Sequence, residues 1–172
     1  MPELQRLRPD HAPALLAFER ENREYFAKSV PDRGDAYFAE FDARHAALLA
    51  EQGAGLCHFH VLVDGDGAVV GRVNLVDVAD GEAELGYRIA EGATGRGLAT
   101  AAVRQLCGVA AAEYGLTALR AATYADNAGS RAVLERAGFT LTGVEPLLPE
   151  GRSEAHYFRE LRSFRPGGAD GR

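Results

Sequence analysis

Three residues, Gly95, Arg96 and Gly97, stand directly before a long apolar segment that is typical of a helix. The first turn of a helix carries unpaired N–H groups and the positive end of the helix dipole, so it attracts anions. Glycines at that point let the backbone approach a ligand without a Cβ in the way. Because Arg96 adds a positive charge there, the spacing predicts a binding site for a phosphate group.

Two common phosphate-binding motifs fit this segment poorly. A P-loop is excluded, because no Gly-Lys-Ser/Thr follows the glycines. A dinucleotide fingerprint requires glycine or alanine where this chain has Thr100, and it opens an early βαβ unit. Here the glycines follow a predicted antiparallel meander in mid-chain. The pyrophosphate of coenzyme A is the third ligand that such a turn could hold.

The elements around the turn indicate an α+β fold. Period-two alternation and the turn signals at 64–67 and 79–81 predict an antiparallel meander of three strands, near 56–63, 68–76 and 82–90. Further strands are expected at 3–8, 117–124, from Phe139 and at 153–162. Helices are expected from about residue 10 to a break at 29–34, and at 35–51, 98–114 and 127–137. The sheet is therefore predicted to be mixed but mostly antiparallel, with helices on both faces.

A second block decides between the ligands. Asn127 and Ser130 open a short predicted helix that ends at Gly138-Phe139. Together with the turn, this block resembles the GNAT superfamily of N-acyltransferases, whose phosphate loop reads Q/R-x-x-G-x-G/A. Residues 94–99, TGRGLA, depart from that loop at Thr94 and match it at the later fixed positions. The strand AELGYRI at 83–89 is similar to the RimJ/RimL branch, which acetylates ribosomal proteins.

The resemblance implies that acetyl-CoA is a co-substrate and that no metal takes part. The phosphate loop would bind the pyrophosphate through its backbone, the strand end would pair with the pantetheine arm, and the second block would contact the coenzyme. These cofactor-binding positions are Tyr87, Arg88, Ile89, Gly95, Arg96, Gly97, Leu98, Ala99, Thr100, Asn127, Ser130 and Arg131. For Asn127 a helix cap is a compatible alternative.

Acyl transfer to an amine needs a neutral amine and a stabilised thiolate leaving group. Glu84 resembles the strand glutamate that many relatives use as a base, with Glu82 as a substitute and an exposed carboxylate as the plain alternative. Many relatives supply a tyrosine acid where this chain has Leu134. Ser130 is therefore the first candidate for the acid, with a capping hydroxyl as its alternative, and Tyr124 is the second.

The most plausible acceptor is a protein N-terminal α-amine, with a small metabolite or antibiotic amine as the rival. A non-catalytic acyl-CoA sensor is the alternative from another class. His58 and His60 share a strand face, where packing or pocket lining is favoured over metal binding. The net charge of −6 argues against nucleic-acid binding, and no apolar segment is long enough for a membrane span. We expect one domain over residues 1–165, a disordered tail at 166–172, a cytoplasmic location, and a monomer or homodimer.

Overall fold

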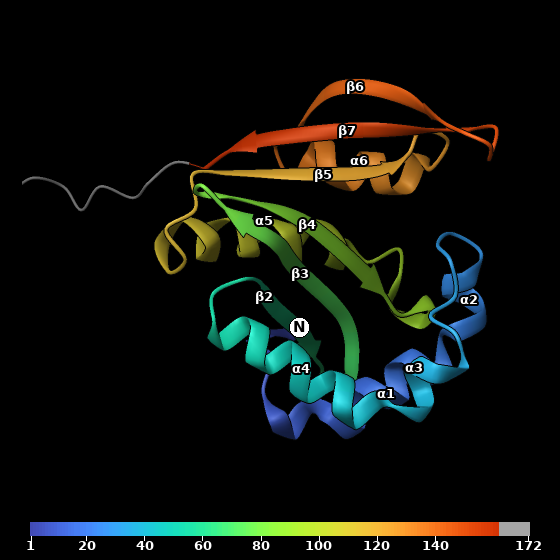
Figure 1. The fold of residues 1–172 in the computed structure, drawn as a ribbon, viewed down its shortest axis with the longest axis vertical. Helices are drawn as coiled ribbons and strands as arrows, with labels where there is room; N and C mark the ends of the chain where they lie inside the picture. The colour runs from blue at the N-terminus through green and yellow to red at the C-terminus, as the bar shows by residue number, and fades with distance from the viewer. Residues whose placement is uncertain (162–172) are drawn as a thin grey trace, which may run out of the picture.

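A seven-stranded sheet organises the computed structural model, which describes residues 1–161. The strand order is β1-β2-β3-β4-β5-β7-β6, and every neighbouring pair is antiparallel except β4 and β5, which are parallel (Figure 1). The strands are β1 (Glu3–Arg6), β2 (His58–Val63), β3 (Val69–Ala79), β4 (Glu82–Ile89), β5 (Ala118–Tyr124), β6 (Thr140–Leu147) and β7 (Arg152–Glu160).

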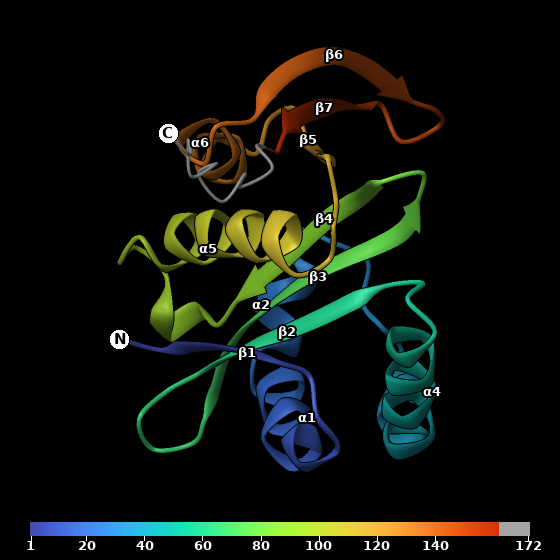
Figure 2. The ribbon, with the colours of Figure 1, turned by 90° about the vertical axis from the view of Figure 1, so that its left-hand side faces the viewer.

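Helices cover both faces of this sheet, so the predicted fold class is confirmed. On one face lie α5 (Leu98–Ala112) and α6 (Ala128–Arg136), and on the other lie the four helices that precede β2 (Figure 2). Those four are α1 (Ala12–Glu21), α2 (Arg23–Ala27), α3 (Asp35–Ala39) and α4 (Phe41–Gly53), preceded by a 3-10 turn, η1, at Pro9–His11. A second 3-10 turn, η2 (Glu91–Ala93), joins β4 to the glycine loop.

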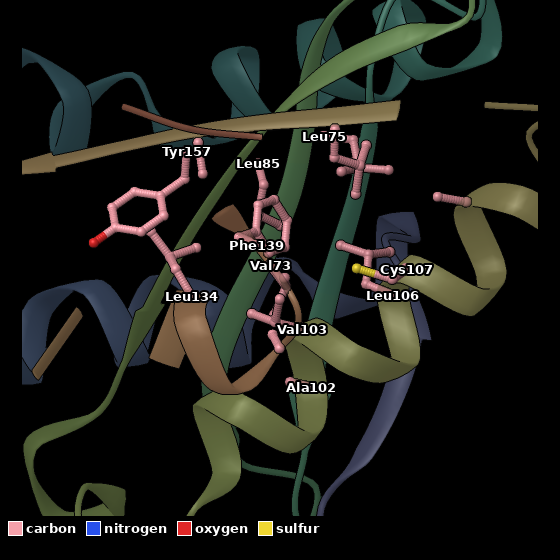
Figure 3. Close-up of a cluster of buried hydrophobic side chains, with 14 of the residues drawn as sticks. Val73, Leu75, Leu85, Ala102, Val103, Leu106, Cys107, Leu134, Phe139 and Tyr157 are labelled. Atoms are coloured by element: carbon pink, nitrogen blue, oxygen red, sulfur yellow. The ribbon is translucent and has the colours of Figure 1, made fainter. Parts of the chain in front are cut away.

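Alternation along the central strands divides the apolar residues between two cores. Val73, Leu75 and Leu85 point toward α5, where they pack against Val103 and Leu106 (Figure 3). The even-numbered residues of β4 and β5 point to the opposite face, because successive side chains of a strand alternate. The face of β4 that contacts α5 is therefore filled by core side chains such as Ala83 and Leu85.

Two helices that the sequence predicts as continuous are each divided in the structure. The first is broken at Asn22, which has φ −106° and ψ 10°. Its buried side chain donates from Nδ2 to the Phe18 carbonyl at 2.9 Å and accepts from the N–H of Glu91 at 3.0 Å. Asn22 thus ends α1 and ties it to η2. The second helix is broken in the same way at Glu40, with φ −106° and ψ 17°.

The remaining predicted elements are found with ends shifted by one to three residues. The strand expected at 153–162 is β7, which ends at Glu160. The predicted tail, 166–172, lies outside the described residues. Among residues 1–161, no helix is both long enough and apolar enough to cross a membrane.

Candidate active site

Within residues 1–161, β4 and β5 are the one parallel pair of strands, and the sheet opens between them. β4 pairs with β5 from Glu82↔Ala118 to Leu85↔Ala121, and no further. Beyond that point β4 remains paired with β3 as far as Ile89, and β5 remains paired with β7 as far as Tyr124. The two strands therefore diverge, as Figure 1 shows. On the free edge of β4, the backbone polar groups of Tyr87 and Ile89 face an opening that protein does not fill with a strand. The backbone groups of Arg88, the third predicted position, point to β3, because Ala90 donates to the Val70 carbonyl and successive residues alternate.

The N-terminus of α5 lies just beyond the end of β4. Gly95 and Gly97 have φ of 77° and 72°, in the left-handed region that disfavours other residues. A Cβ at either position would meet no atom within 4 Å, so backbone conformation and not packing requires glycine here. Within residues 1–161, no N–H group from Gly95 to Thr100 has a backbone or side-chain acceptor. Six donors next to a helix N-terminus form an anion-binding arrangement.

The side chains of this loop are turned back onto the loop itself. Thr94, which stands where relatives have Gln or Arg, donates from Oγ1 to the Glu91 carbonyl at 2.7 Å. Arg96 donates from Nη2 to the Gly92 carbonyl at 2.9 Å and is otherwise exposed. The loop therefore offers its backbone N–H groups, while Thr94 stabilises the turn. Leu98 is buried, and Ala99 is half-buried against the same core.

Across the opening, α6 begins at Asn127. Its Oδ1 accepts from the N–H of Ser130 at 3.1 Å, so the predicted helix cap is present. The hydroxyl of Ser130 does not cap the helix; it lies 3.0 Å from the Tyr87 hydroxyl on β4. Burial raises the pKa of Tyr87, although the hydrogen bond to Ser130 acts in the opposite direction. This pair of hydroxyls links α6 to the end of β4.

Leu134 follows Ser130 by one helical turn and is 1% exposed within the apolar core. The position where relatives carry a tyrosine is therefore closed to a ligand. Arg131 serves the fold: Nε donates to the Tyr157 hydroxyl at 2.9 Å and Nη1 to the Ala125 carbonyl at 3.0 Å. These bonds fasten α6 to the sheet, so the predicted coenzyme role of Arg131 competes with a structural one.

Glu84 lies at the last part of β4 that pairs with β5. Its Cα partners are Val76 on β3 and Arg120 on β5, and its side chain is half-exposed on the face away from α5. Among residues 1–161, no group donates a hydrogen bond to its carboxylate, which is therefore free to accept a proton. Glu82 points to the same face two residues earlier, in the fully paired part of the strand and farther from the opening.

Tyr124 ends β5, and alternation places it on the same face as Glu84. The guanidinium carbon of Arg152 lies 3.5 Å from its ring centroid. Tyr124 therefore lies on the opposite face of the sheet from Ser130, so the structure does not bring the two predicted acids together.

The predicted pair His58 and His60 packs against Tyr114, near the end of α5. The ring of His58 stacks on Tyr114 with centroids 3.7 Å apart, and Nε2 of His60 lies 2.6 Å from the Tyr114 hydroxyl. Burial lowers the pKa of His60 to about 4, with Arg6 and His58 acting in the same direction. Both histidines are buried, so they form a packing cluster and do not line the opening.

The hydroxyl of Tyr87 is the one feature of the opening that the sequence patterns missed. The sequence predicts only a backbone role for Tyr87. Its odd position on β4 was the available signal, since it places the side chain on the α6 face. The bond to Ser130 could not be inferred, because it depends on where α6 packs.

Comparison with known proteins agrees with the geometry. Residues 3–140 match the acetyltransferase (GNAT) domain model, which is most of the chain. The chain belongs to the GNAT acetyltransferase family. It is 28% identical over 135 residues to YjcK of Bacillus subtilis, a probable N-acetyltransferase, which covers 75% of each chain.

Solved structures share the fold of this GNAT domain. The ribosomal-protein-S5-alanine acetyltransferase of Vibrio fischeri has a TM-score of 0.88 and 19% identity, covering 96% of both chains. RimL, a ribosomal L7/L12 α-N-protein acetyltransferase solved in complex with coenzyme A, has a TM-score of 0.82 and 20% identity, covering 93% of this chain and 94% of that one. Family membership makes this protein an acyltransferase that transfers acetyl groups.

Proposed function

We propose that this enzyme transfers the acetyl group of acetyl-CoA to a protein N-terminal α-amine by direct attack in a ternary complex. The observation that carries the proposal is the opening between β4 and β5, which runs from Glu84 toward the unpaired N–H groups of Gly95–Thr100. A long ligand with a phosphate at one end and a reactive thioester at the other fits such a path.

In this arrangement the backbone N–H groups of the glycine loop bind the pyrophosphate. The pantetheine arm carries amide groups, and it replaces β5 as the hydrogen-bonding neighbour of β4 beyond Leu85. Asn127 keeps its cap through Oδ1, which leaves its Nδ2 free to donate to the arm. Each contact uses a donor or a backbone edge that has no other protein partner among the described residues.

Glu84 acts as the general base. An α-amine has a reference pKa near 8, so a modest fraction is already neutral at pH 7, and the base is needed for the proton that the nitrogen loses during attack. The carboxylate takes the proton that the nitrogen loses as its new C–N bond forms, directly or through one water. The free carboxylate and its place at the end of the paired region support this role.

Ser130 donates the proton that the sulfur of coenzyme A takes up as the C–S bond breaks. Tyr87, through the 3.0 Å bond, orients this hydroxyl and can return a proton to it. Leu134 leaves the position of the usual phenol apolar. The acetyl group thus passes from sulfur to nitrogen. The nitrogen loses one proton to Glu84, and the sulfur gains one from Ser130.

The test is an acetyl-transfer assay with the purified full chain. Acetyl-CoA is combined with peptides that have free N-termini and, separately, with small amines such as spermidine and aminoglycosides. Released thiol and product mass are measured. We expect turnover with peptides at their N-termini. Turnover confined to small amines would replace the proposed acceptor, and acetyl-CoA binding without turnover of any amine would contradict the proposal.

A further inference from the structure

A buried carboxylate with three arginines lies beside the end of β4. Glu19 of α1 is 1% exposed. Its Oε1 accepts from Nη1 of Arg72 at 2.8 Å, and its Oε2 accepts from Nε of Arg33 at 3.1 Å and from Nη1 of Arg88 at 3.2 Å. One carboxylate therefore faces three guanidinium groups, and the cluster has a surplus of positive charge.

The neighbouring acidic residues do not remove this surplus. Asp32 also borders the region, but both of its carboxylate oxygens accept from Arg23, at 3.0 and 2.8 Å. Arg23 further pairs with Asp35 at 2.8 Å. These three residues form a closed group with a negative surplus of one, which is smaller than the positive surplus around Glu19. The pKa of Arg88 is lowered by burial and by the nearby Arg33, the direction that unbalanced positive charge produces.

The two outer arginines are held in fixed orientations. The guanidinium carbon of Arg88 lies 4.7 Å from the ring centroid of Phe26, and that of Arg33 lies 4.8 Å from that of Tyr37. Each of these two side chains donates one N–H to Glu19 and, among residues 1–161, makes no other side-chain hydrogen bond. A guanidinium has five donors, so most of those on Arg33 and Arg88 are unused.

These unused donors border a hollow on the surface. The hollow is open to solvent. It is lined by the charged residues Glu19, Arg23, Asp32, Arg33 and Arg88 and by the apolar residues Phe26, Ala27, Pro31 and Phe38. The Asp32 carboxylate in this lining is already paired with Arg23. Figure 1 shows α2 beside the C-terminal end of β4, where this hollow lies. Two preoriented guanidinium groups at its wall have the geometry that binds an oxyanion in a fork.

The hollow and Glu84 lie on the same face of the same strand. Arg88 follows Glu84 by four residues, which separates their Cα atoms by roughly 13 Å along β4. The opposite face is filled by the core against α5, so an acceptor must reach Glu84 across this face. We infer that Arg33 and Arg88 bind a carboxylate of the acceptor while its amine lies at Glu84. This inference rests on the proposed function and names its substrate class.

The distance between Glu84 and Arg88 limits how far from the N-terminus of a peptide that carboxylate can lie. An extended peptide advances about 3.4 Å per residue, and the arginine side chains reach back toward Glu84. The preferred acceptor is therefore a chain with Asp or Glu within roughly its first five residues. A free amino acid is too short to span the distance, so it is predicted to be a poor acceptor.

The experiment uses pairs of peptides that differ only in charge. Alanine-based peptides with Ser at the N-terminus carry one Glu at position 2, 3, 4 or 5, and each is matched with the Gln peptide. Acetylation efficiency, kcat/KM, is measured at two salt concentrations. Affinity of the same peptides for the enzyme loaded with coenzyme A is measured by titration calorimetry, which does not depend on turnover. Free glutamate and its amide form a separate arm.

Three variants make the test specific. R33Q and R88Q each remove one guanidinium group from the hollow. R20Q is the control, because it removes the same charge from an exposed position of α1 next to Glu19. We expect a preference of about 10-fold or more for the Glu peptide at one or two positions in the natural enzyme. The preference should fall below about 3-fold in R33Q and R88Q and persist in R20Q. Circular dichroism and acetyl-CoA affinity check that each variant is folded. If R88Q does not fold, R33Q, which changes a more exposed residue, carries the test alone.

Two outcomes would overturn the inference. One is equal binding and equal kcat/KM for Glu and Gln peptides at every position, with acetylation intact, which leaves the proposed function standing. The other is a preference that survives in both R33Q and R88Q. If no amine is acetylated, the proposed function fails separately, and the calorimetric preference still decides whether this hollow binds a carboxylate.

Discussion

At the scale of single residues, the clearest prediction concerns Glu84. E84Q removes the proton acceptor but keeps the size of the side chain, so kcat should fall by roughly 10²–10⁴ at pH 7. Because the amine loses its own proton above its pKa, part of the rate should return near pH 9. The matched control is E82Q on the same face of β4, which should retain activity. Equal rates for E84Q and the natural enzyme across this pH range would remove Glu84 from the mechanism.

The pair of hydroxyls gives a second residue-scale prediction. Y87F deletes one partner of the 3.0 Å bond to Ser130, and S130A deletes the other. If Ser130 donates the proton and Tyr87 orients it, each variant should lower kcat by about 10-fold or more, and the double variant should lose little beyond that. Affinity for acetyl-CoA should change much less than kcat. Fully additive losses in kcat would show that the two hydroxyls act independently.

At the scale of elements, we propose that the N-terminus of α5 binds the pyrophosphate of coenzyme A. G97A places a Cβ on a residue with φ of 72°, and G115A does the same at φ of 65° beyond the other end of the same helix. Both should lose about 1–2 kcal/mol of unfolding free energy from the left-handed conformation. Only G97A should weaken binding of acetyl-CoA, measured by calorimetry. Equal weakening by both variants would contradict the assignment of the loop.

The sequence predicts helices and strands correctly where the signal, a hydrophobic period or a turn motif, lies in neighbouring residues. The meander of β2, β3 and β4 and the glycine turn before α5 are such cases. The sequence-based prediction failed at Glu40 and at Asn22. The break at Asn22 comes with a tertiary contact, in which the Asn22 side chain accepts from the N–H of Glu91. The candidate site shows the same limit. The sequence predicts site residues that lie within one motif, whereas the Tyr87–Ser130 contact and the arginines around Glu19 join segments far apart in the chain.

At the scale of the whole molecule, stability should depend on pH through the buried His60. Its pKa of about 4 in the folded state lies below the ordinary histidine value of 6.5, so the unfolded chain binds a proton more readily. The unfolding free energy should therefore fall as pH decreases from about 6.5 to about 4, by at most roughly 1.4 kcal/mol per pH unit from this group. Urea unfolding at several pH values measures the slope.

The matched variant for this slope is H60N, which cannot titrate in that range. Losing the bond to Tyr114 should lower its stability at all pH values, but the slope between pH 4 and 6.5 should become shallower. His58, whose pKa burial also lowers, accounts for part of what remains. An unchanged slope in H60N would mean that His60 does not link stability to pH.

The central claim is that the opening between β4 and β5 directs an acetyl group to an N-terminal amine. One measurement tests it most directly: mass spectrometry of a peptide that contains both a free α-amine and an internal lysine, after incubation with the enzyme and acetyl-CoA. We predict a single acetyl group on the α-amine, and loss of that product in E84Q. Acetylation of the lysine side chain alone, or no acetylated peptide from an enzyme that binds acetyl-CoA, would contradict the claim.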